Sequence, residues 1–341
     1  MVPELQFGNR GDVAPQGVRD GPVFVAGCGR SGTTLVRTWL NSHPEIFVPT
    51  ESLFLKDYVA GTTCLPQAVA EFLFYREPQL RCWYTGPRFR LRPIGEGINR
   101  IHEHQAGLEG ARVWGQKTPR FVRCMPEFDA VLPGLRWVLV HRDPRAVVAS
   151  MRRSRRHTSS LYRSVRRWKR DNQPVVDVIA NGAEPTGRIL VVGYERLVGD
   201  PENEWRRICD FVGVKRISLS TVAGQARIER FTRSRFDNNA VRDGVAPTAA
   251  RRERWRETLT AEEIAFVETA CRPEMKALGY EPIREVSQSR VPRPVQEVVR
   301  QVGDVRIVGQ YLRHWPEYLV WTVLRKVSFG VGRLFYAVRG R

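Results

Sequence analysis

The stretch GPVFVAGCGRSGTTLVRTWLNS at residues 21–42 decides the fold class of this chain. Residues 21–27 form a short apolar run that ends in glycine, as a buried β-strand does. Residues 34–42 have the composition of a helix, which His43-Pro44 ends. Between them lies the glycine-rich turn GCGRSGTT at 27–34. A strand, a glycine-rich turn and a helix begin a βαβ unit, so we expect an α/β fold with a parallel sheet flanked by helices.

The glycine-rich turn has the composition of an anion-binding loop. Glycines let the backbone wrap around an anion, and the amides at the start of the next helix point toward it. The glycine spacing is that of a P-loop, but Thr33 stands where a nucleoside-triphosphate loop carries its lysine. Arg30 supplies a cation inside the turn instead, which suits a less charged group bound without a metal. The alternative is a turn that only connects the strand to the helix.

The remaining chain continues the alternation of strands and helices. Further strands are expected at 112–115, 135–140 and 189–193, and helices at 144–155, 161–180, 202–212 and 260–278. Asp143 before Pro144 and the pair Thr260 and Glu263 are helix start signals, whereas Pro174 predicts a kink or break. We expect a flexible leader at 1–20, the main domain at 21–283 with a helical substrate-side insertion at 52–111, and a basic amphipathic extension at 284–341.

Composition limits the classes of partner. The chain has 341 residues and a formal charge of +19, so we expect an acidic partner such as nucleic acid, a membrane surface or a phosphorylated small molecule. The six cysteines have no zinc-site spacing, and we expect them to be reduced and mostly buried. The first twenty residues lack the apolar core of a secretory signal. We therefore expect a cytoplasmic protein, with a peripheral membrane position as an alternative.

At this point the sequence resembles a known family. GRSGTTLVRTWLNSHPEIFVPTES at 29–52 is similar to the 5′-phosphosulfate loop of sulfotransferases that use 3′-phosphoadenosine 5′-phosphosulfate (PAPS), above all bacterial, protein-tyrosine and heparan-type members. The resemblance spans about 21–282 and continues through GQKTPRFV (115–122), LVHRDPRAVVASM (139–151), GYERLVGDPENEWRRICDFVGV (193–214) and RWRETLTAEE (254–263). It implies PAPS as donor, PAP as product, no required metal, and a donor site made of Gly29, Arg30, Ser31, Gly32, Thr33, Thr34, Arg142 and Ser150.

Arg142 and Ser150 are the residues that the resemblance assigns to the 3′-phosphate. Arg142 follows an apolar strand, and Ser150 lies eight residues later on the expected helix, so a hydroxyl can return beside the guanidinium. The alternative is a surface ion pair for Arg142 and a serine that faces its own helix. We expect Arg145, Arg152 and Arg153 to form a solvated basic face.

Glu51 and Lys117 are the expected catalytic residues. Glu51 matches the general base of the tyrosylprotein and heparan-type relatives, and Lys117 matches the lysine that stabilises the bridging oxygen. Relatives that act on small molecules use a histidine two residues after the lysine, but this chain has Pro119 there. Alternatives are a helix cap for Glu51 and a solvated strand end for Lys117. Other candidate bases are His43, expected to be structural, and His102 and His104, expected in an exposed loop.

Several other residues have expected roles. Cys28 lies in the turn, where packing is the simplest role and oxidation would block donor binding. Tyr194 and Glu195 are expected to be structural. Arg251 and Arg252 replace small residues that relatives carry before Trp255, so their contact with the 3′-phosphate is left open. The aromatic residues of the insertion are available to line an acceptor pocket: Phe72, Phe74, Tyr75, Trp83 and Tyr84.

The C-terminal extension contains an apolar segment interrupted by Arg325, Lys326 and Arg333. Those charges disfavour a membrane-spanning helix. Apolar residues at helical spacing define one face, formed by Val320, Val323, Leu324, Val327, Val331, Leu334 and Val338. An interfacial membrane helix, homodimerisation and packing on the domain are all open, and the last two are favoured. We expect the extension to be dispensable for chemistry.

The function that these observations favour is sulfuryl transfer from PAPS to a hydroxyl of a small-molecule, lipid or carbohydrate acceptor. A P-loop kinase for small molecules fits the spacing of the turn, but the turn lacks its lysine, and we find no clear context for a Mg²⁺-binding aspartate. A nucleic-acid-binding protein fits only the net charge, because no nucleic-acid-binding motif appears and the basic residues are scattered. We therefore expect no specific nucleic acid as a partner.

Overall fold

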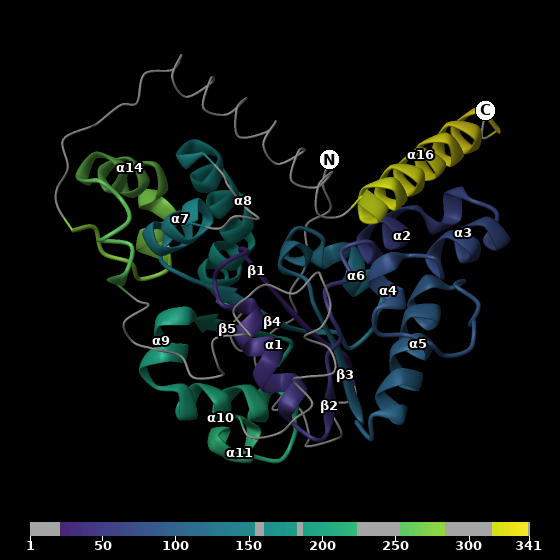
Figure 1. The fold of residues 1–341 in the computed structure, drawn as a ribbon, viewed down its shortest axis with the longest axis horizontal. Coiled ribbons are helices and arrows are strands. Elements are labelled where there is room, and N and C mark those ends of the chain that lie inside the picture. Colours follow the sequence, from purple (N-terminus) through teal and green to yellow (C-terminus); the bar gives the residue numbers. More distant parts are fainter. Residues whose placement is uncertain (1–20, 154–159, 183–186, 224–252, 284–315, 340–341) are drawn as a thin grey trace.

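The computed structural model describes residues 21–153, 160–182, 187–223, 253–283 and 316–339. A five-stranded parallel sheet has the order β2-β3-β1-β4-β5 and is flanked by helices, which confirms the expected fold class (Figure 1). Its strands are β1 (Val23–Gly27), β2 (Ile46–Phe47), β3 (Val113–Lys117), β4 (Arg136–His141) and β5 (Ile189–Gly193). The sequence analysis did not predict β2, because two residues are too short for a visible alternating pattern.

The two faces of the sheet have separate cores because side chains alternate along each strand. Val23 and Val25 of β1 face one core together with Trp39 and Trp205. The helices of that side are α1 (Thr33–Ser42), α9 (Tyr194–Gly199), α10 (Pro201–Val212) and α11 (Leu219–Ala223). Phe24 faces the other side, where it contacts four aromatic rings.

The second face is covered by helices from three parts of the chain. They are η2 (Pro119–Arg123), α6 (Met125–Val131), α7 (Pro144–Arg153), α8 (Leu161–Ala180) and α14 (Ala261–Ala277). The start signals of α7 and α14 are confirmed, since Asp143 Oδ1 accepts from the Arg145 amide and Thr260 and Glu263 form a capping box. Of the expected kink or break at Pro174, the break is wrong, because α8 is one helix through that residue. Packing of α8 against α7 and α14 outweighs the hydrogen bond that proline removes.

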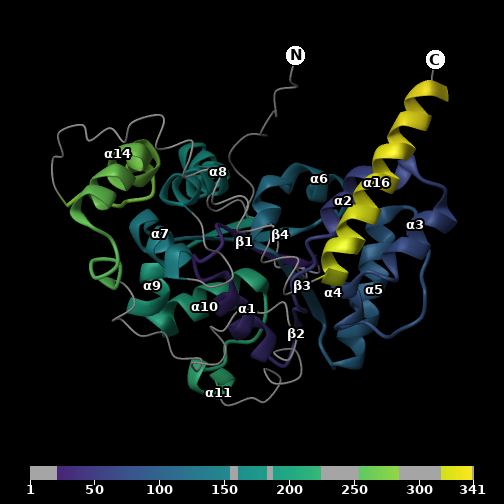
Figure 2. The same cartoon turned by 45° about the horizontal axis from the view of Figure 1, so that its top comes forward.

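The insertion between β2 and β3 is helical, as expected. It contains α2 (Leu55–Gly61), η1 (Thr62–Cys64), α3 (Gln67–Phe74), α4 (Pro78–Arg81) and α5 (Ile94–Leu108). The C-terminal helix α16 (Pro316–Arg339) contacts α2, α4 and η1, and both ribbon views place it along the insertion (Figures 1 and 2). Within the described ranges, no helix combines the length and apolar character needed to cross a membrane.

Candidate active site

The glycine-rich turn connects β1 to α1 at the carboxyl edge of the sheet. Gly32 precedes α1 with a φ of 98°, and a β-carbon there would lie 2.5 Å from Cδ2 of Tyr194. Only glycine fits both this conformation and this close approach. Arg30 adopts a φ of 76°, which is uncommon for a residue other than glycine. The turn therefore holds a cationic side chain on a strained backbone at the start of a helix, where an anion binds favourably.

Arg142 joins this turn from the end of β4. Its guanidinium donates to the carbonyl oxygen of Arg30 at 3.2 Å and lies 3.9 Å from the ring centroid of Tyr194. Arg30 Nε donates in turn to Ser150 Oγ at 3.0 Å, so α7 contributes a hydroxyl to the same place. The structure thus brings together Arg30, Arg142 and Ser150, which the sequence analysis assigned to the donor.

The charges that surround Arg30 are cationic. Burial and, after it, the guanidinium groups of Arg142, Arg167 and Arg153 lower the pKa of Arg30. Arg167 also approaches the turn closely, because a β-carbon on Gly29 would lie 2.6 Å from its guanidinium nitrogen. Converging cations repel one another unless an anion lies between them, so the arrangement is that of an anion-binding site.

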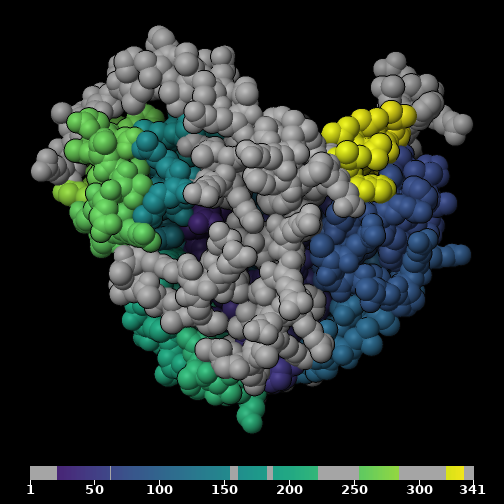
Figure 3. Space-filling view, in the orientation of Figure 1, coloured from purple at the N-terminus to yellow at the C-terminus, as the bar shows by residue number. Residues whose placement is uncertain are grey.

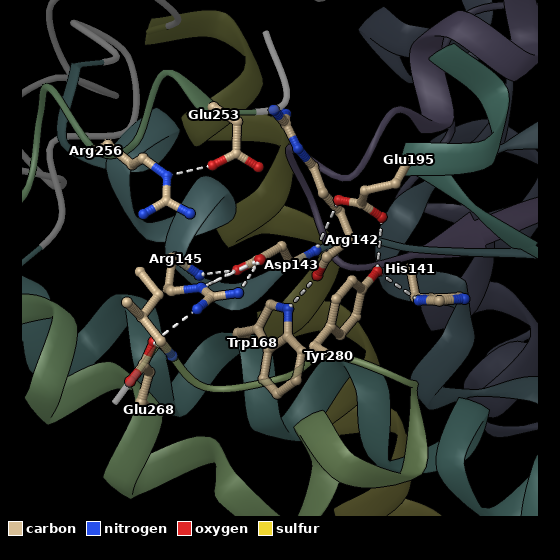
Figure 4. Close-up of polar contacts among 11 residues, drawn as sticks. His141, Arg142, Asp143, Arg145, Trp168, Glu195, Glu253, Arg256, Glu268 and Tyr280 are labelled. Atoms are coloured by element: carbon tan, nitrogen blue, oxygen red, sulfur yellow. Dashed lines mark hydrogen bonds and ion pairs between the residues drawn. The ribbon is translucent and has the colours of Figure 1, made fainter. Parts of the chain in front are cut away.

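A hydrogen-bond network holds the backbone of Arg142 in place (Figure 4). Trp168 Nε1 donates to the Arg142 carbonyl at 2.9 Å, and the next amide, that of Asp143, donates to Glu195 at 3.2 Å. Tyr280 donates to the other oxygen of Glu195 at 2.9 Å, and its hydroxyl lies 2.8 Å from Nδ1 of His141. Burial raises the pKa of Glu195 and lowers that of His141 to about 4. A neutral His141 can therefore donate to Tyr280 while Tyr280 donates to Glu195.

The expectation of a solvated basic face is wrong for Arg145. This residue is buried and lies 2.6 Å from both Asp143 and Glu268 (Figure 4). Its guanidinium lies 4.5 Å from the ring centroid of Trp255. Only the tertiary structure supplies Glu268, which lies 123 residues away in sequence. Arg152 and Arg153 are exposed, as expected, and Arg152 pairs with Glu263.

At the other side of the turn, Lys117 connects the glycine-rich turn to Glu51. Lys117 is the last residue of β3 and is 1% exposed, so it is not a solvated strand end. Its ammonium group lies 2.6 Å from Glu51 Oε1 and 3.4 Å from Thr34 Oγ1. The side chain of Glu51 is one quarter exposed. A cation, a carboxylate open to solvent and a loop hydroxyl therefore meet at one point.

Buried polar groups next to Glu51 and Lys117 form hydrogen bonds that hold the neighbouring residues in place. Ser52 receives a hydrogen bond from Gln116 at 3.3 Å, and the Ser52 amide donates to Thr118 at 3.0 Å. Gln116 also lies 2.7 Å from Nε2 of His102. The expectation of an exposed loop at 102–104 is wrong, because these residues belong to α5 and His102 is fully buried on the ring of Trp114. Burial lowers the pKa of His102 to about 4, so it is a neutral acceptor for Gln116.

Three further sequence predictions concern His43, Cys28 and residues 247–252. His43 is buried, as its expected structural role requires, and its ring nitrogens contact the Lys215 carbonyl and the Glu45 amide. Cys28 is buried too, and burial followed by Asp171 raises its thiol pKa well above the usual value, which favours packing. Residues 247–252, with Arg251 and Arg252, lie outside the described residues.

The aromatic residues of the insertion mainly build its core. Phe74 is fully buried against Phe54 and Tyr58, while Trp83 packs on Phe47. Phe72 is exposed, with the guanidinium of Arg76 3.7 Å from its ring centroid. The expectation that these rings line an acceptor pocket therefore has no support at Phe72 or Phe74.

Sequence reasoning missed Tyr194 and Arg167 as parts of the site. Strands β4 and β5 pair with His141 opposite Gly193, so the residues that follow, Arg142 and Tyr194, emerge side by side. The strand ends are visible in the sequence, but the order of the strands is not. Arg167 lies within α8, and no local pattern distinguishes it from the other arginines of that helix.

Comparisons with known proteins find related sequences. A model of the sulfotransferase family matches residues 22–218. Protein-tyrosine sulfotransferase A of Caenorhabditis elegans is 24% identical over 314 residues, which cover 84% of this chain and 74% of that protein. Nodulation protein NoeE of Sinorhizobium fredii is 24% identical over 292 residues, covering 76% and 65%. The chain spans less than two thirds of the length of several such relatives.

Solved structures show a similar fold. The sulfotransferase domain from the curacin biosynthetic pathway superimposes with a TM-score of 0.54 at 16% identity, covering 76% of this chain and 98% of that domain. The sulfotransferase domain of the Synechococcus PCC 7002 olefin synthase gives the same TM-score at 18% identity, with 80% and 99% covered.

Proposed function

The chain belongs to the sulfotransferase family, whose model matches more than half of its residues, and from this we propose that it transfers a sulfuryl group from PAPS to a hydroxyl group of an acceptor. The observation that carries the proposal is the position of Lys117. Its ammonium group contacts both Thr34 of the anion-binding turn and Glu51. A group bound by the turn and an acceptor beside Glu51 would therefore meet at Lys117.

The donor would lie across the cationic cluster. Arg142 and Ser150 would hold the 3′-phosphate, and the amides of the turn, with Arg30, Thr33 and Thr34, would hold the 5′-phosphosulfate. Arg30 contacts Ser150 at 3.0 Å and receives a hydrogen bond from Arg142 at its carbonyl, so it belongs to both subsites. The converging guanidinium groups supply the positive charge that a bisphosphate nucleotide needs.

Transfer would proceed in line between two oxygens. The acceptor hydroxyl gives its proton to Glu51 as its oxygen forms a bond to sulfur, and the bond from sulfur to the bridging phosphate oxygen breaks. The electron pair of that bond stays on the phosphate of PAP. Lys117 exchanges its contact with Glu51 for the bridging oxygen and stabilises the charge that develops there.

The acceptor would be a small molecule, a lipid or a carbohydrate. Several relatives are named for the tyrosine residues of proteins or for carbohydrates, so the family name does not select one class. Glu51 can serve any acceptor that presents a hydroxyl, because its role requires only a proton to remove.

Calorimetric titration with PAP and with ADP, without Mg²⁺, tests the donor. The two nucleotides differ in the position of one phosphate, so a site built for the 3′-phosphate binds PAP more tightly. Arg142→Ala should remove most of this preference, about 1.5–3 kcal/mol for a charge-assisted contact. Arg152→Ala is the matched control, because Arg152 is exposed on α7, the helix that follows Arg142, and pairs with Glu263. Equal affinity for PAP and ADP in the wild-type protein would contradict the proposal.

Incubation with ³⁵S-labelled PAPS and a panel of phenols, sugars and lipids then identifies the acceptor class. Label should move to one class in the wild-type protein and stay on the nucleotide in Glu51→Gln. Tight PAP binding without transfer to any acceptor would contradict the assignment of transfer while leaving the nucleotide site in place.

A further inference from the structure

Helix α16 packs on the insertion through a face that includes the charged side chain of Arg325. Arg325 is 2% exposed, and its guanidinium lies 2.8 Å from Asp57 and 2.6 Å from Glu77. Glu77 is itself fully buried, so the two acids neutralise a cation that is removed from water. Residues 57, 77 and 325 come from separate segments, and their ion pairs therefore fix which face of α16 turns inward.

Neighbouring positions on the inner face agree with this orientation. Phe329 is 3% exposed, and its ring centroid lies 5.1 Å from that of Tyr58. A β-carbon on Gly332 would lie 2.3 Å from the carbonyl oxygen of Cys64, so the helix approaches η1 closely there. The inner face is thus defined by one ion-paired arginine, one aromatic ring and one small residue.

The outer face of α16 is apolar and exposed. Five aliphatic side chains at helical spacing are each 47–57% exposed, and we call them the outer stripe: Val320, Val323, Leu324, Val327 and Val331. The space-filling view shows α16 at the rim of the molecule above the insertion (Figure 3). Such a stripe costs free energy in water and indicates an interaction surface.

Exposed cations accompany the stripe. Lys326 and Arg333 are both exposed. Because they lie seven residues apart, they share one side of the helix with each other. The chain as a whole carries a charge of +19. A helix with an aliphatic stripe and flanking lysine or arginine is suited to the interface of a membrane that contains anionic lipids.

We propose that the outer stripe of α16, with Lys326 and Arg333, docks the protein on an anionic lipid surface. The helix would lie in the plane of the interface, with the valines among the acyl chains and the two cations at the phosphate groups. This inference does not depend on the transfer chemistry. It would place the insertion, and with it the Glu51 side of the site, next to the membrane.

A second copy of the chain is a weaker candidate for the same face. A standard interface contains roughly 20–30 residues from each partner, whereas the outer stripe has five. Two copies would also bring Lys326 and Arg333 of both molecules together, and a charge of +19 on each opposes association. The charge favours an anionic surface.

Sedimentation with vesicles tests the proposal on the full chain. We expect the protein to sediment with vesicles of phosphatidylcholine and phosphatidylglycerol, and far less with phosphatidylcholine alone. Val323→Ser/Val327→Ser should lower the partition coefficient about 100-fold, because it removes four methyl groups from the lipid contact. Lys326→Gln/Arg333→Gln should lower it about 30-fold, and 0.5 M salt should have a similar effect.

The matched control is Leu108→Ser/Ile283→Ser, which removes two exposed aliphatic side chains elsewhere on the surface. It should bind vesicles as the wild type does. All variants should keep the wild-type melting temperature, since none of the changed side chains is buried. Equal vesicle binding by the stripe variant and the wild type would overturn the proposal. A second result would also overturn it: light scattering shows that the wild type is a dimer and Val323→Ser/Val327→Ser a monomer, and the wild type does not sediment with vesicles.

Discussion

Arg30, which is half-buried, and Arg325, which is buried, are two arginines in opposite electrostatic surroundings. Burial and then neighbouring guanidinium groups lower the pKa of Arg30, with Arg142 the first of these. At Arg325, burial acts in the same direction, but Glu77 and Asp57 outweigh it and the pKa is raised. The carboxyl edge of the sheet around Arg30 therefore concentrates positive charge, whereas the insertion pairs the positive charge of Arg325 with its own acids.

This difference in surroundings distinguishes a surface suited to bind an anion, around Arg30, from a structural contact, around Arg325. Burying a cation is unfavourable without a partner. At Arg325 the partners belong to the chain, so the contact stabilises the fold. Around Arg30 the charges that act are mostly those of other cations, so a ligand that supplies negative charge gains most there. Four predictions test whether the two regions behave in these separate ways.

The largest effect is expected at the point where the two regions meet. Glu51→Gln keeps the shape of the side chain but removes the proposed base, so single-turnover transfer from labelled PAPS should fall about 10²–10⁴-fold. Affinity for PAP should stay near the wild-type value. Lys117→Ala should also reduce the rate, and the double variant should lose less than the sum of the two effects because both groups act in one transition state.

Glu45→Gln is the matched control for this prediction. It makes the same chemical change at a carboxylate that pairs with Arg112, and it should keep the wild-type rate. If Glu51→Gln retained more than about a tenth of the wild-type rate, the base would lie elsewhere, since a positioned carboxylate contributes more than that.

Arg325→Ala should destabilise the protein by about 3–5 kcal/mol, because it leaves the buried Glu77 without its cation. Denaturant unfolding measures the loss, and Lys326→Ala, one residue away and exposed, should change little. PAP affinity of the folded fraction should be retained. Because α16 packs on the insertion and contributes no residue to the proposed PAP site, a chain that ends near Ile283 should also bind PAP. Loss of PAP binding in either variant would break the separation between the two regions.

Arg30→Ala should weaken binding of PAPS by about 1.5–3 kcal/mol, the contribution of a charge-assisted hydrogen bond. Adenosine 3′-phosphate lacks the 5′ group and should lose less. Competition binding with the two ligands measures the difference, and Arg152→Ala should affect neither. Equal losses for both ligands would mean that Arg30 supports the fold of the turn.

The smallest effect is expected at Tyr280, which acts through Glu195. Tyr280→Phe removes the hydrogen bond to Glu195 and the one from His141. Only the bond to Glu195 acts on the Arg142 backbone, so PAP affinity should fall by about 0.5–1.5 kcal/mol. Burial raises the pKa of Glu195 and the Tyr280 hydroxyl counters this, so its removal should raise that pKa further. The carboxyl group then protonates at higher pH, and the acid limb of PAP binding should move to higher pH.

Tyr75→Phe removes a hydroxyl of the insertion that donates to the Phe89 carbonyl, and it is the control for the Tyr280 variant. Its PAP affinity and pH profile should match those of the wild type. An unchanged acid limb in Tyr280→Phe would remove Tyr280 and Glu195 from the positioning of Arg142.

The elements near the anion-binding turn could be predicted because their signals are local. An apolar run, glycines at fixed spacing and a helix start lie within 21–42, and neighbouring residues decide each of them. Asp143 before Pro144 defined the start of α7 in the same way. The proposed donor residues Arg30, Arg142 and Ser150 were found from motifs around these elements, and the structure brings them into contact.

Residues whose surroundings come from distant segments could not be assigned. His102 was expected in a loop but is buried on Trp114, and Arg145 was expected at the surface but pairs with Glu268. In both cases the residue type suggested exposure, and a partner on another element, Trp114 of β3 or Glu268 of α14, reversed it. Pro174 belongs to the same group, since packing keeps α8 continuous.

Helix α16 shows most directly how far the sequence alone predicts the structure. The sequence by itself determined that Val323, Val327 and their neighbours share one face, because helical spacing depends only on residue order. Which face turns inward was decided by the tertiary structure, where Asp57 and Glu77 meet Arg325. Periodicity identifies a face, but a buried ion pair depends on three separate segments meeting, and only the folded chain brings them together.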